Sequence, residues 1–194
     1  MAVDEWGLVR DWNPAPDGPG VGAFEHYYTL GDAVAIGRAL HELLRSADVV
    51  GMANWPQTVN VIGAIKTTRN HAALDPVGHV LALYRHQFAG ELLPVRAPAD
   101  QPLDVVAARD ASGGVIVALI NFSPRDTLSV RLHFAADGQP SPRAAWRIDG
   151  ADLGAINIPG QRESVTTRTL SESMSPDQPL ELPSHSLTIV KTQE

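Results

Sequence analysis

The hydrophobic pattern of the chain changes near Glu91, and this change constrains the fold more than any other sequence feature. Before it, apolar residues recur at helical spacing or form short continuous runs. After it, apolar and polar residues alternate with the two-residue period of half-buried strands. The sequence therefore predicts an α/β part over residues 1–90 and an antiparallel β-sandwich over residues 91–194.

The first 90 residues predict a strand, a loop, a helix and a second strand. Residues 2–3 end a short strand, and residues 11–22, which are rich in proline and glycine, predict a long loop. Thr29 predicts the N-cap of a helix whose apolar residues recur at helical spacing over residues 33–47. Residues 48–54 are nearly all apolar, which is typical of a parallel strand buried on both faces. This order predicts the last strands and helices of an incomplete (β/α)8 barrel.

A second predicted helix and a series of predicted strands complete the chain. Asp75 predicts the N-cap of that helix, Pro76 its first turn, and Gly90 a position beyond its end. The predicted strands cover residues 103–109, 114–122, 127–134, 144–148, 164–170 and 187–191. Turn-forming segments separate several of them, as at residues 110–114, 123–126 and 137–140.

Composition restricts the kinds of partner that the chain can have. A net charge of -7 with scattered acidic residues disfavours nucleic acid and anionic membranes, and favours a neutral or small ligand. The absence of cysteine excludes disulfides and thiolate metal sites, and it favours a cytoplasmic location. No apolar run approaches the roughly 20 residues that span a bilayer. The seven histidines have no ligand spacing and no glycine-rich phosphate loop occurs, so we expect neither a metal nor a cofactor.

Two short motifs at predicted strand ends carry the candidate chemistry. Asp4-Glu5-Trp6 follows the first strand, and Asn54-Trp55-Pro56-Gln57 ends the second. Working residues of strand-loop-helix barrels sit at such carboxyl ends. Adjacent side chains of a strand point to opposite sides, so Asp4 and Glu5 cannot both face one ligand. Glu5 alone would be an ordinary surface carboxylate, but the second motif at this distance makes it the candidate catalytic group.

The chain resembles the C-terminal portion of an α-L-arabinofuranosidase of glycoside hydrolase family 51. The similarity rests on the two motifs and on residues 30–33 and 45–50, which stand in the family's order and at about its spacing. The resemblance implies that Glu5 is the catalytic nucleophile of a retaining mechanism. It also implies that Gln57 hydrogen-bonds the sugar, with Asn54 and Trp6 as further substrate-binding candidates. Packing in the core is the alternative for Trp6.

The resemblance also defines the whole protein that we expect. It implies removal of terminal arabinofuranosyl groups from hemicellulose or pectin side chains, and assembly as a homo-oligomer. Glycoside hydrolysis ordinarily needs two carboxyl groups, and the family's acid/base follows an Asn-Glu pair on an earlier barrel strand. No such pair occurs in the 194 residues. We therefore expect the acid/base residue to precede Met1 and the 194 residues alone to be inactive.

The chain departs from the family pattern at two places. Val9 stands where the family has a tryptophan, for which Trp12 is a candidate substitute, and Trp55-Pro56 replaces Leu-Ala. These departures leave the shape of the pocket and the preferred sugar open. Three alternatives also stay open: a non-catalytic carbohydrate-binding or structural module, a split enzyme completed by a second chain, and an endo-acting hydrolase of the same architecture.

Overall fold

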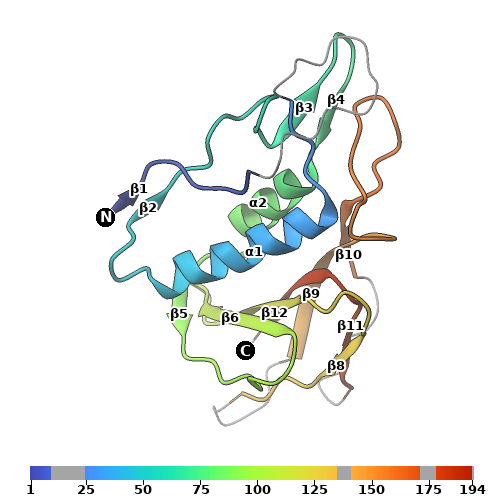
Figure 1. Cartoon of the computed structure of the whole chain (residues 1–194). Coiled ribbons are helices and arrows are strands. Elements are labelled where there is room, and N and C mark those ends of the chain that lie inside the picture. Colours follow the sequence, from blue (N-terminus) through green and yellow to red (C-terminus); the bar gives the residue numbers. More distant parts are fainter. Residues whose placement is uncertain (10–24, 135–140, 171–177, 194) are drawn as a thin grey trace. The chain divides into compact units, whose positions relative to one another are not determined.

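The computed structural model describes residues 1–9, 25–134, 141–170 and 178–193 (Figure 1). The predicted loop at residues 11–22, with Trp12, and the predicted turn at residues 137–140 lie outside the described residues. The chain forms two compact units, Met1–Leu81 with Gly150–Thr166, and Ala82–Asp149 with Thr167–Glu194. Neither described helix has the length and apolar composition needed to cross a membrane. The predicted division near residue 90 into a barrel part and a sandwich stays a prediction.

The first unit begins with two short parallel strands joined through a helix. β1 (Ala2–Val3) pairs in parallel with β2 (Met52–Ala53), and α1 (Leu30–Arg45) lies between them in sequence (Figure 1). The predicted N-cap of α1 is confirmed, because the Asp32 backbone N–H donates to the Thr29 hydroxyl at 3.2 Å and the Asp32 carboxylate accepts from the Thr29 backbone N–H at 2.8 Å. This reciprocal pair satisfies two of the amide groups that a helix start leaves without partners.

The burial predicted for the second strand is not reached among the described residues. Residues 48–54 were expected to form a strand buried on both faces, but β2 has two residues. Met52 is 51% exposed and Val49 is 55% exposed. A strand is buried on both faces only where helices or further strands cover it, and the described residues place a single strand, β1, beside β2. They accordingly form no closed (β/α)8 barrel.

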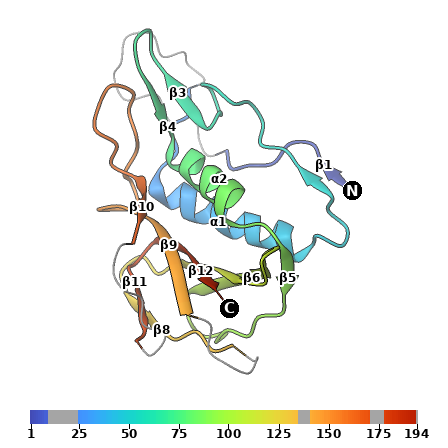
Figure 2. The same cartoon turned by 180° about the vertical axis from the view of Figure 1, so that it is seen from behind.

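A hairpin and the start of the second helix belong to the same unit. β3 (Ile65–Thr67) and β4 (Ala72–Leu74) pair antiparallel, and Figure 2 shows this hairpin extending away from α1. α2 (Pro76–Gln87) begins directly after Asp75, whose carbonyl accepts from the His79 N–H at 3.2 Å, so the predicted start of this helix is confirmed. The close approach of Gly78 to the hairpin explains why glycine stands there, since an added Cβ would lie 2.4 Å from the Ala64 carbonyl oxygen.

Residues 150–166 contact the start of α1 through main-chain hydrogen bonds. The Leu30 N–H donates to the Ala155 carbonyl at 2.9 Å, and the Gly31 N–H donates to the Leu153 carbonyl at 2.9 Å. The Asn157 side chain donates to the Leu74 carbonyl at 2.9 Å. This late segment therefore supplies main-chain acceptors to helix amides that α1 cannot satisfy internally.

The second unit is built on a six-stranded sheet in the order β10-β9-β12-β7-β6-β5. The strands are β5 (Glu91–Leu93), β6 (Leu103–Arg109), β7 (Val115–Asn121), β9 (Ser141–Asp149), β10 (Thr166–Thr169) and β12 (Ser186–Gln193). β8 (Leu128–Val130) and β11 (Leu180–Leu182) form a separate antiparallel pair. Apolar side chains from both sheets share one core, which includes Val117, Leu119, Leu182 and Val190. Two sheets around one core agree with the predicted β-sandwich.

Candidate functional site

The two predicted motifs follow the same end of a parallel strand pair. β1 runs directly into Asp4 and Glu5, and β2 runs directly into Asn54. Main-chain pairing continues past the strands, since the Asn54 N–H donates to the Val3 carbonyl at 3.0 Å and the Trp6 N–H donates to the Asn54 carbonyl at 3.3 Å. Parallel strands end at the same edge, so the structure brings Trp6 and Asn54 together and puts Glu5 beside them in sequence.

The polar candidates are open and the aromatic ones are half-buried. Glu5, Asn54 and Gln57 are exposed, whereas Trp6 and Trp55 are half-buried. No hydrogen bond or ion pair joins the Glu5 carboxylate to another described residue. A carboxylate that is exposed to solvent and makes no bond within the described fold is accessible to a ligand.

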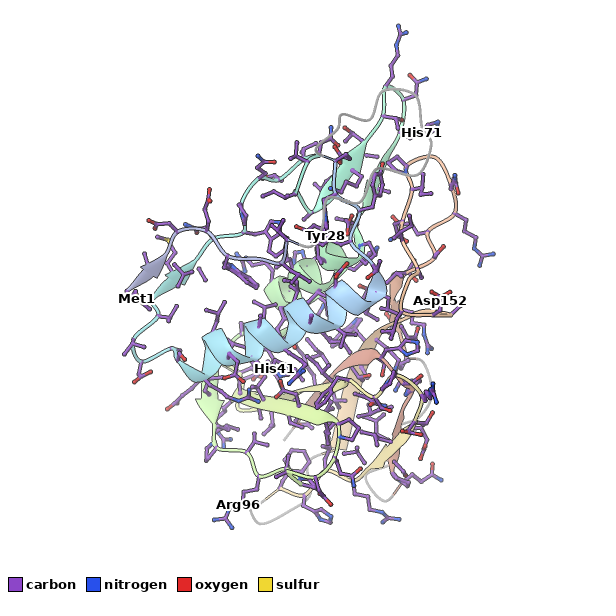
Figure 3. All side chains as sticks on the ribbon, viewed as in Figure 1. Met1, Tyr28, His41, His71, Arg96 and Asp152 are labelled. Carbon is purple, nitrogen blue, oxygen red and sulfur yellow. The ribbon has the colours of Figure 1, made fainter. Side chains whose placement is uncertain are left out.

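Aromatic rings pack against one another beside these polar groups. The Trp6 and Trp55 rings meet edge to face with centroids 5.4 Å apart, and Trp55 meets Tyr28 at 5.7 Å. Tyr28 lies above the first turn of α1 in Figure 3. Gly7 allows Trp55 to approach the backbone, because an added Cβ would lie 3.3 Å from that ring. The indole nitrogens of Trp6 and Trp55 are buried without a hydrogen-bond partner in the described part of the chain.

The turn that carries Gln57 contains an unusual backbone. Gln57, Asn60 and Val61 have φ values of 56°, 58° and 52°. Side chains rarely adopt this left-handed region, and for a β-branched valine it is a genuine outlier. Each such residue costs about 1–3 kcal/mol, and it persists where its surroundings hold it in place.

A buried charged cluster lies against that turn. The Lys66 ammonium donates to the Val61 carbonyl at 2.9 Å and lies 3.2 Å from the Glu25 carboxylate, which accepts from the Val61 N–H at 2.9 Å. The Lys66 side chain is 0% exposed. The third member of the cluster is Asp75, which accepts from the Tyr28 N–H at 3.2 Å.

Burial dominates the protonation of this cluster. Burial raises the pKa of Asp75 to about 8, although the charge of Lys66 and hydrogen bonds from the Tyr28 and Val77 backbone act in the opposite direction. Burial also lowers the pKa of Lys66, against the attraction of Asp75 and Glu25. Desolvation raises the pKa of Tyr28 as well, with further contributions from nearby carboxylates. Desolvation is therefore the largest influence on the pKa of all three side chains.

The sequence motifs missed this cluster. Asp75 has a recognisable role as a helix cap, but its deep burial has no local sequence signal. Lys66 stands in a three-residue strand and Glu25 in a segment without regular structure. In β3 the buried Lys66 stands between two less buried residues, and the sequence Ile-Lys-Thr alone does not indicate this inward direction.

Comparison with known proteins identifies relatives over nearly the whole chain. The family described as "Alpha-L-arabinofuranosidase C-terminal domain" matches residues 4–186. A probable α-L-arabinofuranosidase C of Aspergillus clavatus is 29% identical over 98% of this chain and 39% of its own length. The α-L-arabinofuranosidase C of Emericella nidulans has the same identity and coverage. The chain thus spans about two fifths of the length of these relatives.

Solved structures share the fold of the chain. The family 51 α-L-arabinofuranosidase of Thermotoga petrophila superposes with a TM-score of 0.79, at 22% identity over 98% of this chain and 42% of its own. The family 51 arabinofuranosidase of Xanthomonas axonopodis pv. citri has a TM-score of 0.76, at 26% identity over 99% of this chain and 41% of its own. Both are similar to this chain along almost its full length.

Proposed function

Because the chain belongs to the α-L-arabinofuranosidase C-terminal domain family, we propose that the whole protein removes terminal α-L-arabinofuranosyl groups from hemicellulose or pectin side chains. Its curated relatives carry the name of that activity. The observation that carries the proposal is the position of Glu5 and Gln57, which follow the same end of two paired parallel strands. Catalytic groups of strand-helix barrels come from such strand ends.

In this proposal β1, α1 and β2 are the last strands and a helix of a (β/α)8 barrel. The parallel pairing of β1 with β2 across α1 supports it, since parallel strands need such a crossover. The exposure of Met52 and Val49 also fits, because earlier parts of a barrel would cover this region. The chain accounts for 39% of the length of its relatives, which leaves ample chain for the other strands.

The proposed mechanism uses Glu5 as a nucleophile. Its carboxylate attacks the anomeric carbon, and a second carboxyl group protonates the departing oxygen, which gives a covalent arabinosyl-enzyme. That group then deprotonates the water that releases the sugar with retained configuration. We assign the second carboxyl group to polypeptide outside these 194 residues, and we therefore expect the 194 residues alone to be inactive.

Three further residues hold the sugar in this proposal. Gln57 and Asn54 are exposed beside the strand ends and offer amide donors and acceptors to sugar hydroxyls. The third residue is Trp6, whose half-buried side chain stands beside Asn54, since its backbone N–H donates to the Asn54 carbonyl at 3.3 Å.

The test uses the full-length protein and a mechanism-based arabinofuranosyl inactivator. We expect covalent label on Glu5 by mass spectrometry, and a loss of arabinofuranoside hydrolysis of at least about a thousandfold in Glu5→Gln. Asp4→Asn is the matched control, because it removes the adjacent exposed carboxylate, and it should keep label and turnover. Label on another residue would refute the role of Glu5. Sugar affinity without hydrolysis in the parent, unchanged in Glu5→Gln, would instead support a non-catalytic carbohydrate-binding module.

A further inference from the structure

The turn at residues 57–61 is stabilised by bonds that converge on Val61. Its N–H donates to the Glu25 carboxylate at 2.9 Å, and its carbonyl accepts from the Lys66 ammonium at 2.9 Å and from the His26 N–H at 2.8 Å. The left-handed conformation of Val61 turns these two backbone groups toward the cluster. Both polar groups of the most strained residue in the turn are therefore bonded, and two of the three bonds involve a buried charge.

The remaining contacts of the turn join it to the β3–β4 hairpin. The Asn60 N–H donates to the Ile65 carbonyl at 2.8 Å, and the Ile65 N–H donates to the Thr58 carbonyl at 3.0 Å. The Asn60 side chain accepts from the Thr67 N–H at 2.8 Å. These bonds hold the base of the turn. In contrast, Gln57 is exposed, and it precedes the left-handed residues Asn60 and Val61 by three and four positions.

We propose that Glu25 and Lys66 are positioning residues that hold Val61 in its left-handed conformation and thereby set the orientation of Gln57 toward the substrate. The role of Gln57 in this inference rests on the proposed function. The bonds from Glu25 and Lys66 to the Val61 backbone, which we call the clamp, rest on the structure alone. Glu25 and Lys66 are buried, and both bond the backbone of Val61, so in this proposal they act through the backbone. Charge-assisted hydrogen bonds are the stronger kind, which suits them to holding a strained residue.

The first measurement is hydrogen exchange of the amides at residues 57–64 in the full-length protein. Glu25→Ala removes the acceptor of the Val61 N–H, and we expect exchange in this segment to accelerate about tenfold or more. Glu25→Gln keeps an acceptor oxygen and should exchange much more slowly than Glu25→Ala. Glu42→Gln is the control, because it breaks the exposed ion pair with Arg45 in the same unit. Unchanged exchange in Glu25→Ala would overturn the clamp, whatever the protein hydrolyses.

The second measurement is a double-variant cycle in kcat/KM for an arabinofuranoside. We expect Glu25→Ala to lower kcat/KM about tenfold, and to lower it no further once Gln57→Ala is present. A merely structural role for Glu25 would lower kcat/KM by the same factor in both backgrounds, which would overturn the proposal. If the parent hydrolyses no arabinofuranoside, the proposed function fails, and hydrogen exchange then decides the clamp alone.

The third measurement tests whether Val61→Gly rescues the Glu25→Ala variant. Glycine adopts positive φ without strain, so Val61→Gly should restore most of kcat/KM to the Glu25→Ala variant, while the amide at position 61 keeps its faster exchange because its acceptor is still absent. Failure of this rescue would contradict the clamp. Should Glu25→Ala fail to fold, Glu25→Met with Lys66→Met removes both charges together, which leaves neither ion of the pair buried alone. This double variant loses both side-chain bonds to Val61 and should show the same faster exchange and the same rescue.

Discussion

Replacing Asp75 by asparagine tests whether burial or the nearby ammonium group of Lys66 controls this carboxyl. Asp75 is fully buried before α2, and one of its oxygens accepts from the Tyr28 N–H at 3.2 Å. The other oxygen has no hydrogen-bond partner in the described residues. Asparagine is similar in size and keeps a carbonyl oxygen for the Tyr28 N–H. The change therefore removes the titration while it preserves the shape of the site.

The sign of the effect follows from the raised pKa of Asp75. The pKa is about 8 in the folded chain and 3.8 as the ordinary value. Between these two pH values the folded state holds a proton that the unfolded state has lost, so the free energy of unfolding falls as pH rises. The stabilisation from the raised pKa of Asp75 is complete below about pH 4 and is lost as pH rises to about 8. A shift of about four pH units corresponds to roughly 5 kcal/mol between the two limits.

The assay is urea denaturation at a series of pH values from 5 to 9. Fluorescence in a Trp146→Phe background follows the tryptophans that precede residue 82 in the sequence. We expect Asp75→Asn to be more stable than the parent by about 1–2 kcal/mol at pH 5, and this difference should grow to several kcal/mol at pH 9. A difference that stays constant across this range would refute the reasoning, since Asp75 would then be ionised throughout and paired with Lys66 despite its burial.

Three further stability predictions use local packing and can be measured by urea denaturation. Leu119→Ala removes a fully buried side chain from the core shared by the two sheets and should cost about 2–5 kcal/mol. Thr29→Ala removes the hydroxyl of the α1 capping box and should cost about 1 kcal/mol. Gly78→Ala brings a methyl group to within 2.4 Å of the Ala64 carbonyl and should cost about 1–3 kcal/mol, whereas Gly51→Ala, which meets nothing within 4 Å, should be nearly neutral.

Elements that depend on neighbouring residues in sequence could be predicted. The start of α1 follows from Thr29 and Asp32, three residues apart, because a capping box is a local structure. The predicted strand at residues 103–109 agrees with β6, since its own run of apolar residues determines it. The β3–β4 hairpin was not predicted, because strands of three residues are too short to establish a two-residue period.

Among the features that depend on distant parts of the chain, strand topology could be predicted and burial could not. The apolar composition of residues 48–54 predicted burial, but Met52 and Val49 are exposed because burial requires a covering element. The positions of Glu5 and Gln57 at one edge of a strand pair could be predicted, since topology alone determines which ends of parallel strands meet. Their catalytic and substrate-binding roles stay predictions.

The clamp on Val61 explains why a site can be recognised before its geometry can be derived. Gln57 belongs to a short motif, whereas its orientation depends on Glu25 and Lys66, which stand 32 positions before it and nine after it. Nothing local to Val61 favours a left-handed backbone, and its β-branched side chain opposes one. Its two backbone groups are bonded by the buried side chains of Glu25 and Lys66 and by the His26 N–H, all of which are distant in sequence or outside the motif. Orientation at this turn is therefore a property of the packed unit, and substitutions that never touch a ligand should be able to change how the ligand is bound.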